Sequence, residues 1–206
     1  GVNPLRGKNN VQGSCDMGSF PHEFVGYRHV SDDTVREQFS QIWGVTLREE
    51  PGMRIPNMLD SAVSGRFKGL YIQGEDIAQS DPNTQHVAAA LSAMDCVIVQ
   101  DLFLNETAQF AHVFLPGTSF LEKDGTFTNA ERRINRVRPV MTSRTGRSEW
   151  EATCALSEAM GYSMPYESAA AIMDEIAELT LTFAGVSYDL LVVLGSVPWT
   201  CNTQEP

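Results

Sequence analysis

The first eighteen residues combine a freely adjustable backbone with polar and positively charged side chains. They read GVNPLRGKNNVQGSCDMG, and Arg6 and Lys8 are their only basic residues. Glycine lets a backbone approach a ligand closely, and arginine offers a rigid fork of donors that matches a carboxylate. The segment therefore predicts a site for a small anion, with Arg6 and Lys8 as its charged residues. A polar surface loop is the alternative.

Acidic and amide side chains follow two predicted buried strands. The stretch FKGLYIQG ends in Gly74, and Glu75 and Asp76 come directly after it. The stretch DCVIVQD ends in Gln100 and Asp101. Carboxylates at the carboxyl ends of parallel strands suit a ribose diol or the N1/N2 edge of guanine. The spacing predicts a nucleotide site at this sheet edge; ordinary turns with solvated acids are the alternative.

Several familiar chemical signatures are absent from the sequence. There is no GxGxxG and no GxxxxGK[ST], so neither a standard NAD fingerprint nor a P-loop is present. No two cysteines are close enough to form a metal-binding knuckle, and the four histidines form no HxxxH pair. We therefore predict no metal ligand and no complete catalytic set in this chain. We expect Cys96, in an apolar run, to be a core thiol, and His112 to be structural.

Charge and composition limit the classes of partner. The chain has 206 residues and a net charge of -11, which argues against a surface for double-stranded nucleic acid. A local basic cluster of six arginines lies within residues 132–147 and could meet phosphates, another part of the protein or solvent. The most apolar stretch, residues 190–197, is far too short to cross a membrane. The first residue is Gly1 rather than methionine, from which we expect a piece of a longer protein.

The elements that would position these residues alternate between strand and helix. Between residues 67 and 116 the chain reads as strand, helix, strand, short helix and strand. This order predicts an α/β fold, a Rossmann-like, doubly wound, mostly parallel sheet with helices on both faces. Residues 1–30 read as irregular and residues 120–140 as a hairpin or irregular β segment. Further helices are predicted over 32–43, 55–64, 148–160 and 168–179.

The predicted organisation is one structural unit with three stretches. Residues 1–66 form the irregular glycine-rich segment and its helices. Residues 67–147 form the dinucleotide-binding α/β region, and residues 148–206 form a helical segment that packs on the same domain.

Four stretches together resemble the central region of the formate dehydrogenase large (alpha) subunit, in the molybdopterin oxidoreductase (dimethyl sulfoxide reductase) superfamily. They are GVNPLRGKNNVQGSCDMG, GEDIAQSDPNTQHV, the long stretch VIVQDLFLNETAQFAHVFLPGTSFLEKDGTFTNAERRINRVRPV, and SEWEATCALSEAMGY. The opening stretch is the part specific to formate dehydrogenases. The TFTNAERR stretch is shared across the superfamily, and the resemblance covers nearly the whole chain.

The resemblance implies oxidation of formate to carbon dioxide at a molybdenum or tungsten ion held by two molybdopterin guanine dinucleotides (bis-MGD). It also implies a [4Fe–4S] cluster in a missing N-terminal part. Arg6 matches the arginine that orients formate, and so it is the implied catalytic residue. At Glu149 compensation of helix charge is the alternative role. The implied cofactor-binding residues are Lys8, Gly74, Glu75, Asp76, Ser80, Gln100, Asp101, Thr107 and Glu149.

The implied partners are formate, the remaining domains of the same subunit, and electron-acceptor subunits of the iron–sulfur, diaphorase or hydrogenase type. No nucleic acid and no membrane insertion are expected. A cytoplasmic location is expected, with the periplasm left open because the parent's N-terminus is missing. The alternatives are a nitrate reductase or another molybdopterin oxidoreductase, a non-catalytic electron-transfer subunit of the same superfamily, and a plain dinucleotide-binding module. The isolated chain is expected to be inactive.

Overall fold

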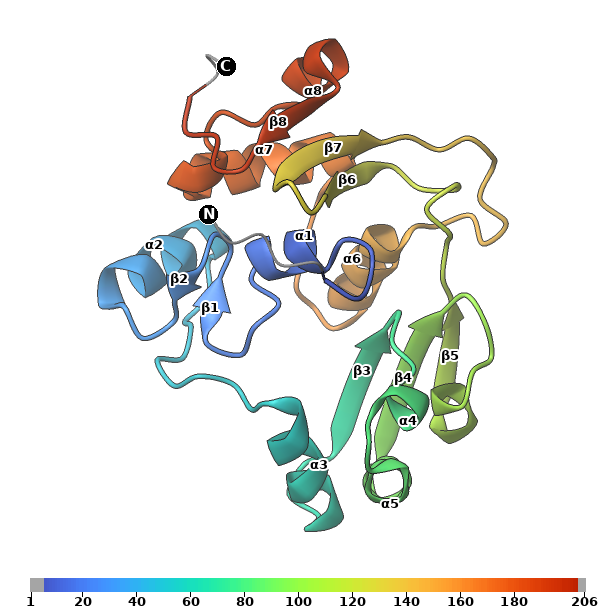
Figure 1. Ribbon diagram of the computed structural model, residues 1–206. Helices are drawn as coiled ribbons and strands as arrows, with labels where there is room; N and C mark the ends of the chain where they lie inside the picture. The colour runs from blue at the N-terminus through green and yellow to red at the C-terminus, as the bar shows by residue number, and fades with distance from the viewer. Residues whose placement is uncertain (1–5, 204–206) are drawn as a thin grey trace. The chain divides into compact units, whose positions relative to one another are not determined.

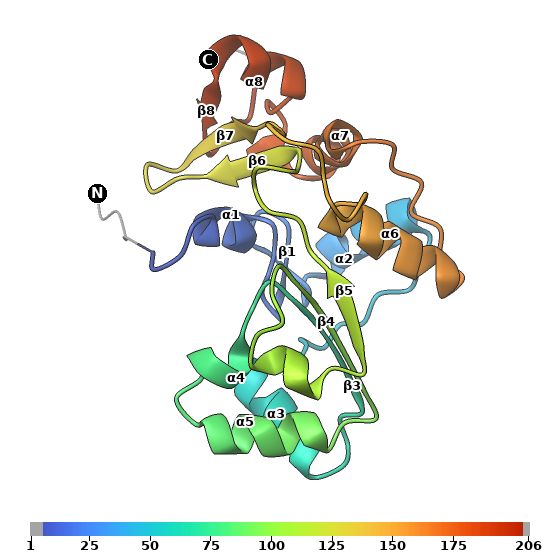
Figure 2. The same ribbon diagram turned by 90° about the vertical axis from the view of Figure 1, so that its right-hand side faces the viewer.

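A computed structural model describes residues 6–203, so residues 1–5 of the glycine-rich opening lie outside the described part. The backbone gathers into two compact units (Figure 1; Figure 2). Unit 1 comprises the described residues of 1–52, 124–138 and 163–206, and unit 2 comprises residues 53–123 and 139–162. Each unit has its own hydrophobic core, and each is described separately below.

Unit 2 is built on a parallel sheet of three strands in the order β3-β4-β5 (Figure 1). The strands are β3 (Gly69–Gln73), β4 (Cys96–Asp101) and β5 (Val113–Pro116). Gln73 pairs with Gln100, and Asp101 pairs with Pro116. The carboxyl ends of the three strands are therefore level, which brings the residues that follow them to one edge of the sheet.

Helices cover both faces of this sheet, as expected for the predicted α/β fold. On one face, Val97 and Val99 of β4 are fully buried against α5, whose Val87 and Leu91 are also fully buried. On the other face, Gln73 of β3 donates a hydrogen bond to a residue of α6. The pleat of the strands explains this division, since alternate side chains point to opposite faces. The helical elements are α3 (Ile55–Val63), α4 (Ile77–Ser80), α5 (Thr84–Ser92), the 3₁₀ turn η1 (Thr107–Phe110) and α6 (Glu149–Ala159).

The helix α6, predicted over 148–160, starts with a capping box. Ser148 is the N-cap, and its backbone N and side-chain Oγ donate to Glu151 Oε2 at 2.6 and 2.7 Å. Because Glu151 makes this cap, the carboxylate of Glu149 in the same turn is available for contacts elsewhere.

Unit 1 contains an antiparallel sheet and most of the remaining helices. The predicted β segment between residues 120 and 140 is a hairpin of β6 (Gly125–Thr128) and β7 (Arg133–Val137), extended by β8 (Ser196–Pro198). Ile134, Phe183 and Leu191 form its buried centre. The other elements are α1 (Val11–Asp16), β1 (Glu23–Phe24), β2 (Arg28–His29), α2 (Asp33–Trp43), α7 (Ala169–Leu179), the 3₁₀ turn η2 (Leu181–Phe183) and α8 (Tyr188–Leu194).

Two sequence-based expectations require correction. Residues 6–30 are not simply irregular, because they contain the helix α1 and the small hairpin β1–β2. Cys96 is exposed and not a core thiol. It is the first residue of β4, where the strand alternation that buries Val97 turns Cys96 away from the core.

His112 is structural, as expected: its Nδ1 accepts a hydrogen bond from Val97 N at 3.0 Å. Within residues 6–203 no helix is long and apolar enough to cross a membrane.

Candidate functional site

A cleft opens at the carboxyl ends of β3 and β4 in unit 2. It has a volume of about 360 Å³, within the range of roughly 300–1,000 Å³ typical of small-molecule sites. Four of the predicted cofactor-binding residues, Gly74, Gln100, Asp101 and Glu149, lie in its wall. We call this the strand-end cleft, and its lining residues are Gln73, Gly74, Gln100, Asp101, Leu102, Thr118, Lys123 and Glu149.

Glu149 organises one side of the strand-end cleft. Its Oε1 accepts a hydrogen bond from Thr118 N at 2.9 Å, and its Oε2 accepts one from Thr118 Oγ1 at 2.9 Å. Lys123 Nζ lies 2.8 Å from Glu149 Oε2 as an ion pair. The carboxylate therefore holds the loop that follows β5 and places a lysine ammonium at the cleft.

The pKa of Glu149 reflects two opposing effects. Burial by itself raises the pKa of this carboxyl, because a charged group loses solvation. The hydrogen bonds from Lys123 and Thr118, together with the positive charge of Lys123, outweigh burial and leave the pKa below its ordinary value. Glu149 is therefore ionised at neutral pH.

Two glycines let the backbone form this wall. Gly74 has a φ of 63°, a left-handed conformation that favours glycine, and its N donates to Gln100 O at 2.9 Å. At Gly117 an added Cβ would lie 3.1 Å from the carbonyl carbon of Asp101 and 3.4 Å from Glu149 Oε1. The close passage of the loop over Asp101 therefore requires a residue without a side chain.

The amide of Gln100 is held in one orientation by its neighbours. Gln100 is 2% exposed, and its Oε1 accepts hydrogen bonds from Tyr71 OH at 2.5 Å and from Gln73 Nε2 at 2.9 Å. Gln73 Nε2 also lies 3.1 Å from Thr153 Oγ1 of α6. Because Oε1 has two donors, the Nε2 donors of Gln100 are the groups left for other contacts.

Asp101 and the residues after β3 take part in local hydrogen bonds. Asp101 accepts from Leu102 N at 2.6 Å and from Asn105 Nδ2 at 2.9 Å. Ser80 Oγ donates to Glu75 Oε1 at 2.6 Å, which folds the predicted GED segment against the end of α4.

Asp76 and Thr107 form a bridge inside unit 2. Thr107 is 0% exposed, its N and Oγ1 donate to Asp76 Oδ1 at 2.9 and 2.6 Å, and its Oγ1 accepts from Ala78 N at 3.0 Å. The structure thus places these two predicted residues together, beside the loop after β3. The strand-end cleft is lined by other side chains.

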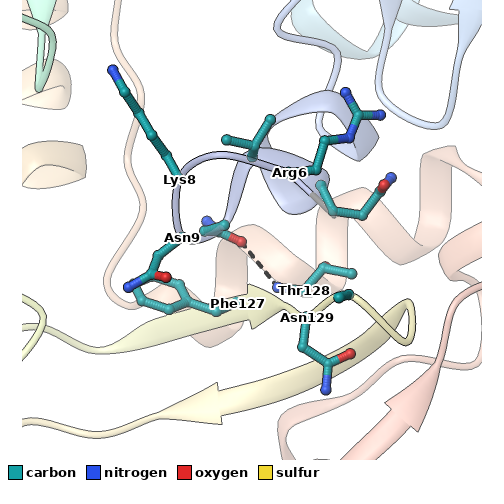
Figure 3. A pocket seen from close by; sticks show the side chains of 10 residues that line it. Arg6, Lys8, Asn9, Phe127, Thr128 and Asn129 are labelled. Carbon is teal, nitrogen blue, oxygen red and sulfur yellow. Dashed lines mark hydrogen bonds between the residues drawn. The ribbon is translucent and has the colours of Figure 1, made fainter. Parts of the chain in front are cut away.

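Arg6 and Lys8 line a second concavity, of about 270 Å³, which lies entirely within unit 1. In Figure 3 both side chains point away from β6, which carries Phe127 and Thr128. Within residues 6–203 the guanidinium of Arg6 has neither a hydrogen-bond nor an ion-pair partner. This concavity is called the Arg6 pocket below, and its lining residues are Arg6, Lys8, Asn9, Asn10, Val11, Gln12, Phe127, Thr128, Asn129 and Ala130.

The backbone around the Arg6 pocket is fixed by one side chain. Asn10 adopts a left-handed conformation with φ 59°, and its Oδ1 accepts a hydrogen bond from Thr128 N at 2.9 Å (Figure 3). Gly13 makes this contact possible, because a Cβ there would lie 2.1 Å from Asn10 Oδ1. The glycine at position 13 thus has a steric cause.

Sequence reasoning missed several lining residues of both sites. Lys123 reaches the strand-end cleft from the loop after β5 and had no signal in the sequence, whereas Thr118 follows the third predicted strand end, HVFLP, and was expected at this sheet edge. The TFTNAERR stretch supplies Phe127, Thr128 and Asn129 to the Arg6 pocket, although residues 1–18 alone carried the anion-site prediction.

The family model described as molybdopterin oxidoreductase matches residues 2–159, more than half of the chain. This chain therefore belongs to the molybdopterin oxidoreductase family.

The relatives point to formate dehydrogenases. The chain is 43% identical over 208 residues to the F420-dependent formate dehydrogenase 1 subunit alpha of Methanococcus maripaludis, covering 100% of this chain and 30% of that protein. It is 42% identical over 203 residues to a Bacillus subtilis (strain 168) protein described as probable oxidoreductase YjgC, covering 98% of this chain and 21% of that protein. The chain thus spans less than a third of the length of these relatives.

A solved structure shares the fold. Acetylene hydratase from Pelobacter acetylenicus superposes with a TM-score of 0.60 at 18% identity, covering 82% of this chain and 24% of that protein. At this identity the likeness shows the α/β arrangement, which is the predicted fold class.

Proposed function

We propose that this chain is the central, dinucleotide-binding segment of a molybdenum or tungsten formate dehydrogenase. The observation that carries the proposal is the Arg6 pocket, in which Lys8 and the Arg6 guanidinium, which has no partner among residues 6–203, line a cavity of about 270 Å³ that can admit a small anion. The 43% identity to a protein named as a formate dehydrogenase alpha subunit supports the same substrate.

The strand-end cleft supports binding of the nucleotide part of the cofactor. Carboxylate and amide groups of Asp101, Glu149 and Gln100 suit the N–H and O–H groups of guanine and ribose, while Lys123 suits a phosphate. This donor set fits a pterin guanine dinucleotide. Gly74 would contribute backbone contact, and Glu75, Asp76, Ser80 and Thr107 would shape the loop after β3.

Arg6 has a defined chemical role in this proposal. Oxidation of formate converts HCOO⁻ to CO₂ and releases one proton and two electrons, and a metal–pterin group held beside Gln100, Asp101 and Glu149 would supply the electron acceptor. The Arg6 guanidinium binds the carboxylate with two parallel hydrogen bonds and fixes its orientation. Lys8 adds positive charge at the same pocket. The partners are then formate, the remaining domains of the subunit with their [4Fe–4S] cluster, and an electron-acceptor subunit.

The test uses the full-length parent enzyme, assayed for formate-dependent dye reduction, metal content and released guanine nucleotide. Arg6→Ala should lower kcat/KM for formate by about 100-fold, as expected for losing a two-pronged ionic contact. Metal and guanine contents should stay at wild-type levels. Arg48→Ala, another exposed arginine of unit 1, is the control and should retain activity.

A second variant tests the cleft. Glu149→Ala should lower the guanine nucleotide recovered per protein, because Thr118 and Lys123 lose the carboxylate that holds them.

Normal formate turnover by Arg6→Ala would contradict the proposal. A metal-replete parent that reduces nitrate and does not oxidise formate would favour a nitrate reductase instead.

A further inference from the structure

The turn between β6 and β7 has an arginine where the backbone favours glycine. Arg132 closes this turn with a φ of 58°, in the left-handed region. Asn129 organises the turn, since its Oδ1 accepts from Glu131 N and from Arg133 N, both at 3.0 Å. A glycine would adopt this backbone conformation more easily than Arg132 does, so the contacts of the arginine side chain must offset that cost.

The guanidinium of Arg132 reaches a buried carboxylate. It lies over the ring of Trp199 at 3.8 Å, and its Nη2 donates to Asp16 Oδ1 at 2.9 Å. Asp16 is 0% exposed, and its Oδ1 also accepts from Gln12 Nε2 and from Tyr27 OH, both at 2.8 Å. Burial, and then the hydrogen bond to Asp16, raises the pKa of Tyr27 to about 12, so its hydroxyl remains a donor at neutral pH.

This cluster is not optimised for stability. Asp16 Oδ2, Arg132 Nε and Trp199 Nε1 are buried, and none has a hydrogen-bond partner among residues 6–203. Asp16 is 0% exposed while the side chain of Arg132 is 37% exposed, so the cost of desolvation falls on the carboxylate and its unsatisfied oxygen. Sites that break such packing rules tend to be functional.

The cluster holds one end of α1, and the Arg6 pocket lies at the other end. Asn10 joins the N-terminus of α1 to the hairpin at Thr128, while Asp16 joins its C-terminus to the same hairpin at Arg132. Gln12 belongs to both sites, because it lines the Arg6 pocket and donates to Asp16. The helix is therefore fixed at both ends on β6 and the turn after it.

We propose that Asp16 and Arg132 are positioning residues that hold the Arg6 pocket in its binding geometry. This explains the TNAERR part of the TFTNAERR stretch, since Thr128, Asn129 and Ala130 line the pocket and Arg132 fixes α1 against them. This inference rests on the proposed function for its substrate, formate. Neither residue contacts the substrate, and both act through Arg6.

The test measures formate KM and kcat in the full-length parent carrying Asp16→Asn or Tyr27→Phe. Asp16→Asn removes the charge that holds Arg132, and we expect formate KM to rise about tenfold or more because the pocket shifts. Metal and guanine contents should not change. Tyr27→Phe keeps the ring and removes one of three donors to Asp16, so it should raise KM in the same direction by less.

Asp124→Asn is the matched control. Asp124 pairs with Arg136 at the open end of the same hairpin, and that guanidinium lies over the ring of Tyr188 at 4.0 Å. The control thus breaks a second aspartate–arginine–aromatic cluster away from the Arg6 pocket. It should lower the melting temperature and leave formate KM unchanged.

The outcomes separate the inference from the proposed function. Unchanged formate KM in both Asp16→Asn and Tyr27→Phe overturns the inference, whatever happens to stability. If Asp16→Asn does not fold, formate KM is measured in Tyr27→Phe and Arg132→Lys instead, and an unchanged KM in both overturns the inference. A wild-type parent without formate turnover refutes the proposed function. The positioning inference is then tested by amide hydrogen exchange of residues 6–16. Faster exchange in Tyr27→Phe than in Asp124→Asn supports positioning, and equal exchange overturns it.

Discussion

At the residue scale, several side chains that read as ligands in the sequence bind one another in the structure. Asp76 is the clearest case, because its Oδ1 accepts both the N and the Oγ1 hydrogen bonds of Thr107. An acid after a buried strand can therefore shape a loop as well as face a ligand. Sequence patterns alone do not distinguish these two roles, since both require a carboxylate at the same position.

The bridge through Thr107 predicts a stability effect. Thr107→Val keeps the shape of the side chain and removes the hydroxyl that joins Asp76 to Ala78 N. Because Thr107 is fully buried, we expect the free energy of unfolding to fall by about 2 kcal/mol. Urea denaturation of the 206-residue chain measures this. Thr107→Ser, which keeps the hydroxyl, should lose only about 1 kcal/mol. A valine variant as stable as the wild type would show that the bridge contributes little.

At the element scale, the loop after β5 depends on two carboxylates. Glu149 holds Thr118 and Lys123, and Glu122 joins the same loop to the segment before α6. Glu122 accepts hydrogen bonds from Arg144 N at 3.0 Å and from Ser119 N at 2.9 Å. The loop that supplies Thr118 and Lys123 to the strand-end cleft is thus tied by carboxylates to α6 and to the segment before it.

Glu122 predicts a pH dependence of stability. The hydrogen bonds from Arg144 N, Ser119 N and Ser119 Oγ lower its pKa from an ordinary 4.5 to about 2. A carboxyl whose pKa is lower in the folded than in the unfolded state stabilises the fold fully at pH values above the unfolded-state pKa. This contribution is lost as pH falls from about 4.5 towards 2. The stability difference between wild type and Glu122→Gln should therefore be constant near neutral pH and shrink below pH 4.5. Denaturation curves between about pH 7 and 3.5 measure it. A difference independent of pH would contradict the assignment.

At the scale of the whole molecule, the chain corresponds to a part of the length of its relatives. Within the described residues 6–203, no three histidine, cysteine, aspartate or glutamate side chains gather as a metal site. The chain also spans less than a third of the relatives compared above. The proposed catalytic role of Arg6 therefore requires ligands from the rest of the parent subunit.

This predicts the behaviour of the purified 206-residue chain. It should neither retain molybdenum or tungsten nor reduce a dye with formate, because metal affinity needs several converging ligands. Metal analysis by mass spectrometry and a dye-reduction assay test both statements. Stoichiometric metal in the isolated chain, or formate-dependent dye reduction by it, would contradict the prediction.

Local patterns of the sequence were sufficient for the elements and for some site residues. Apolar periodicity predicted the helix α2, Pro56 and Gly65 marked the bounds of α3, and short continuous apolar runs predicted β3, β4 and β5. Parallel strands end at one edge, so Gln100 and Asp101 could be placed beside Gly74 before any coordinates. The resemblance to formate dehydrogenases also followed from the sequence, and the family is confirmed.

Only the tertiary structure decided which side chains meet across long separations. Arg132 contacts Asp16, and Thr128 contacts Asn10, across more than a hundred residues each, so no local pattern predicts either pair. Lys123 and Glu149 are closer in the sequence, but they lie on a loop and a helix, so no local pattern predicts their ion pair either. Such contacts depend on how whole elements pack, which is a property of the fold and not of a short stretch of chain. The sequence thus determined the elements and the chemistry they carry, and tertiary packing decided how Arg6 is positioned.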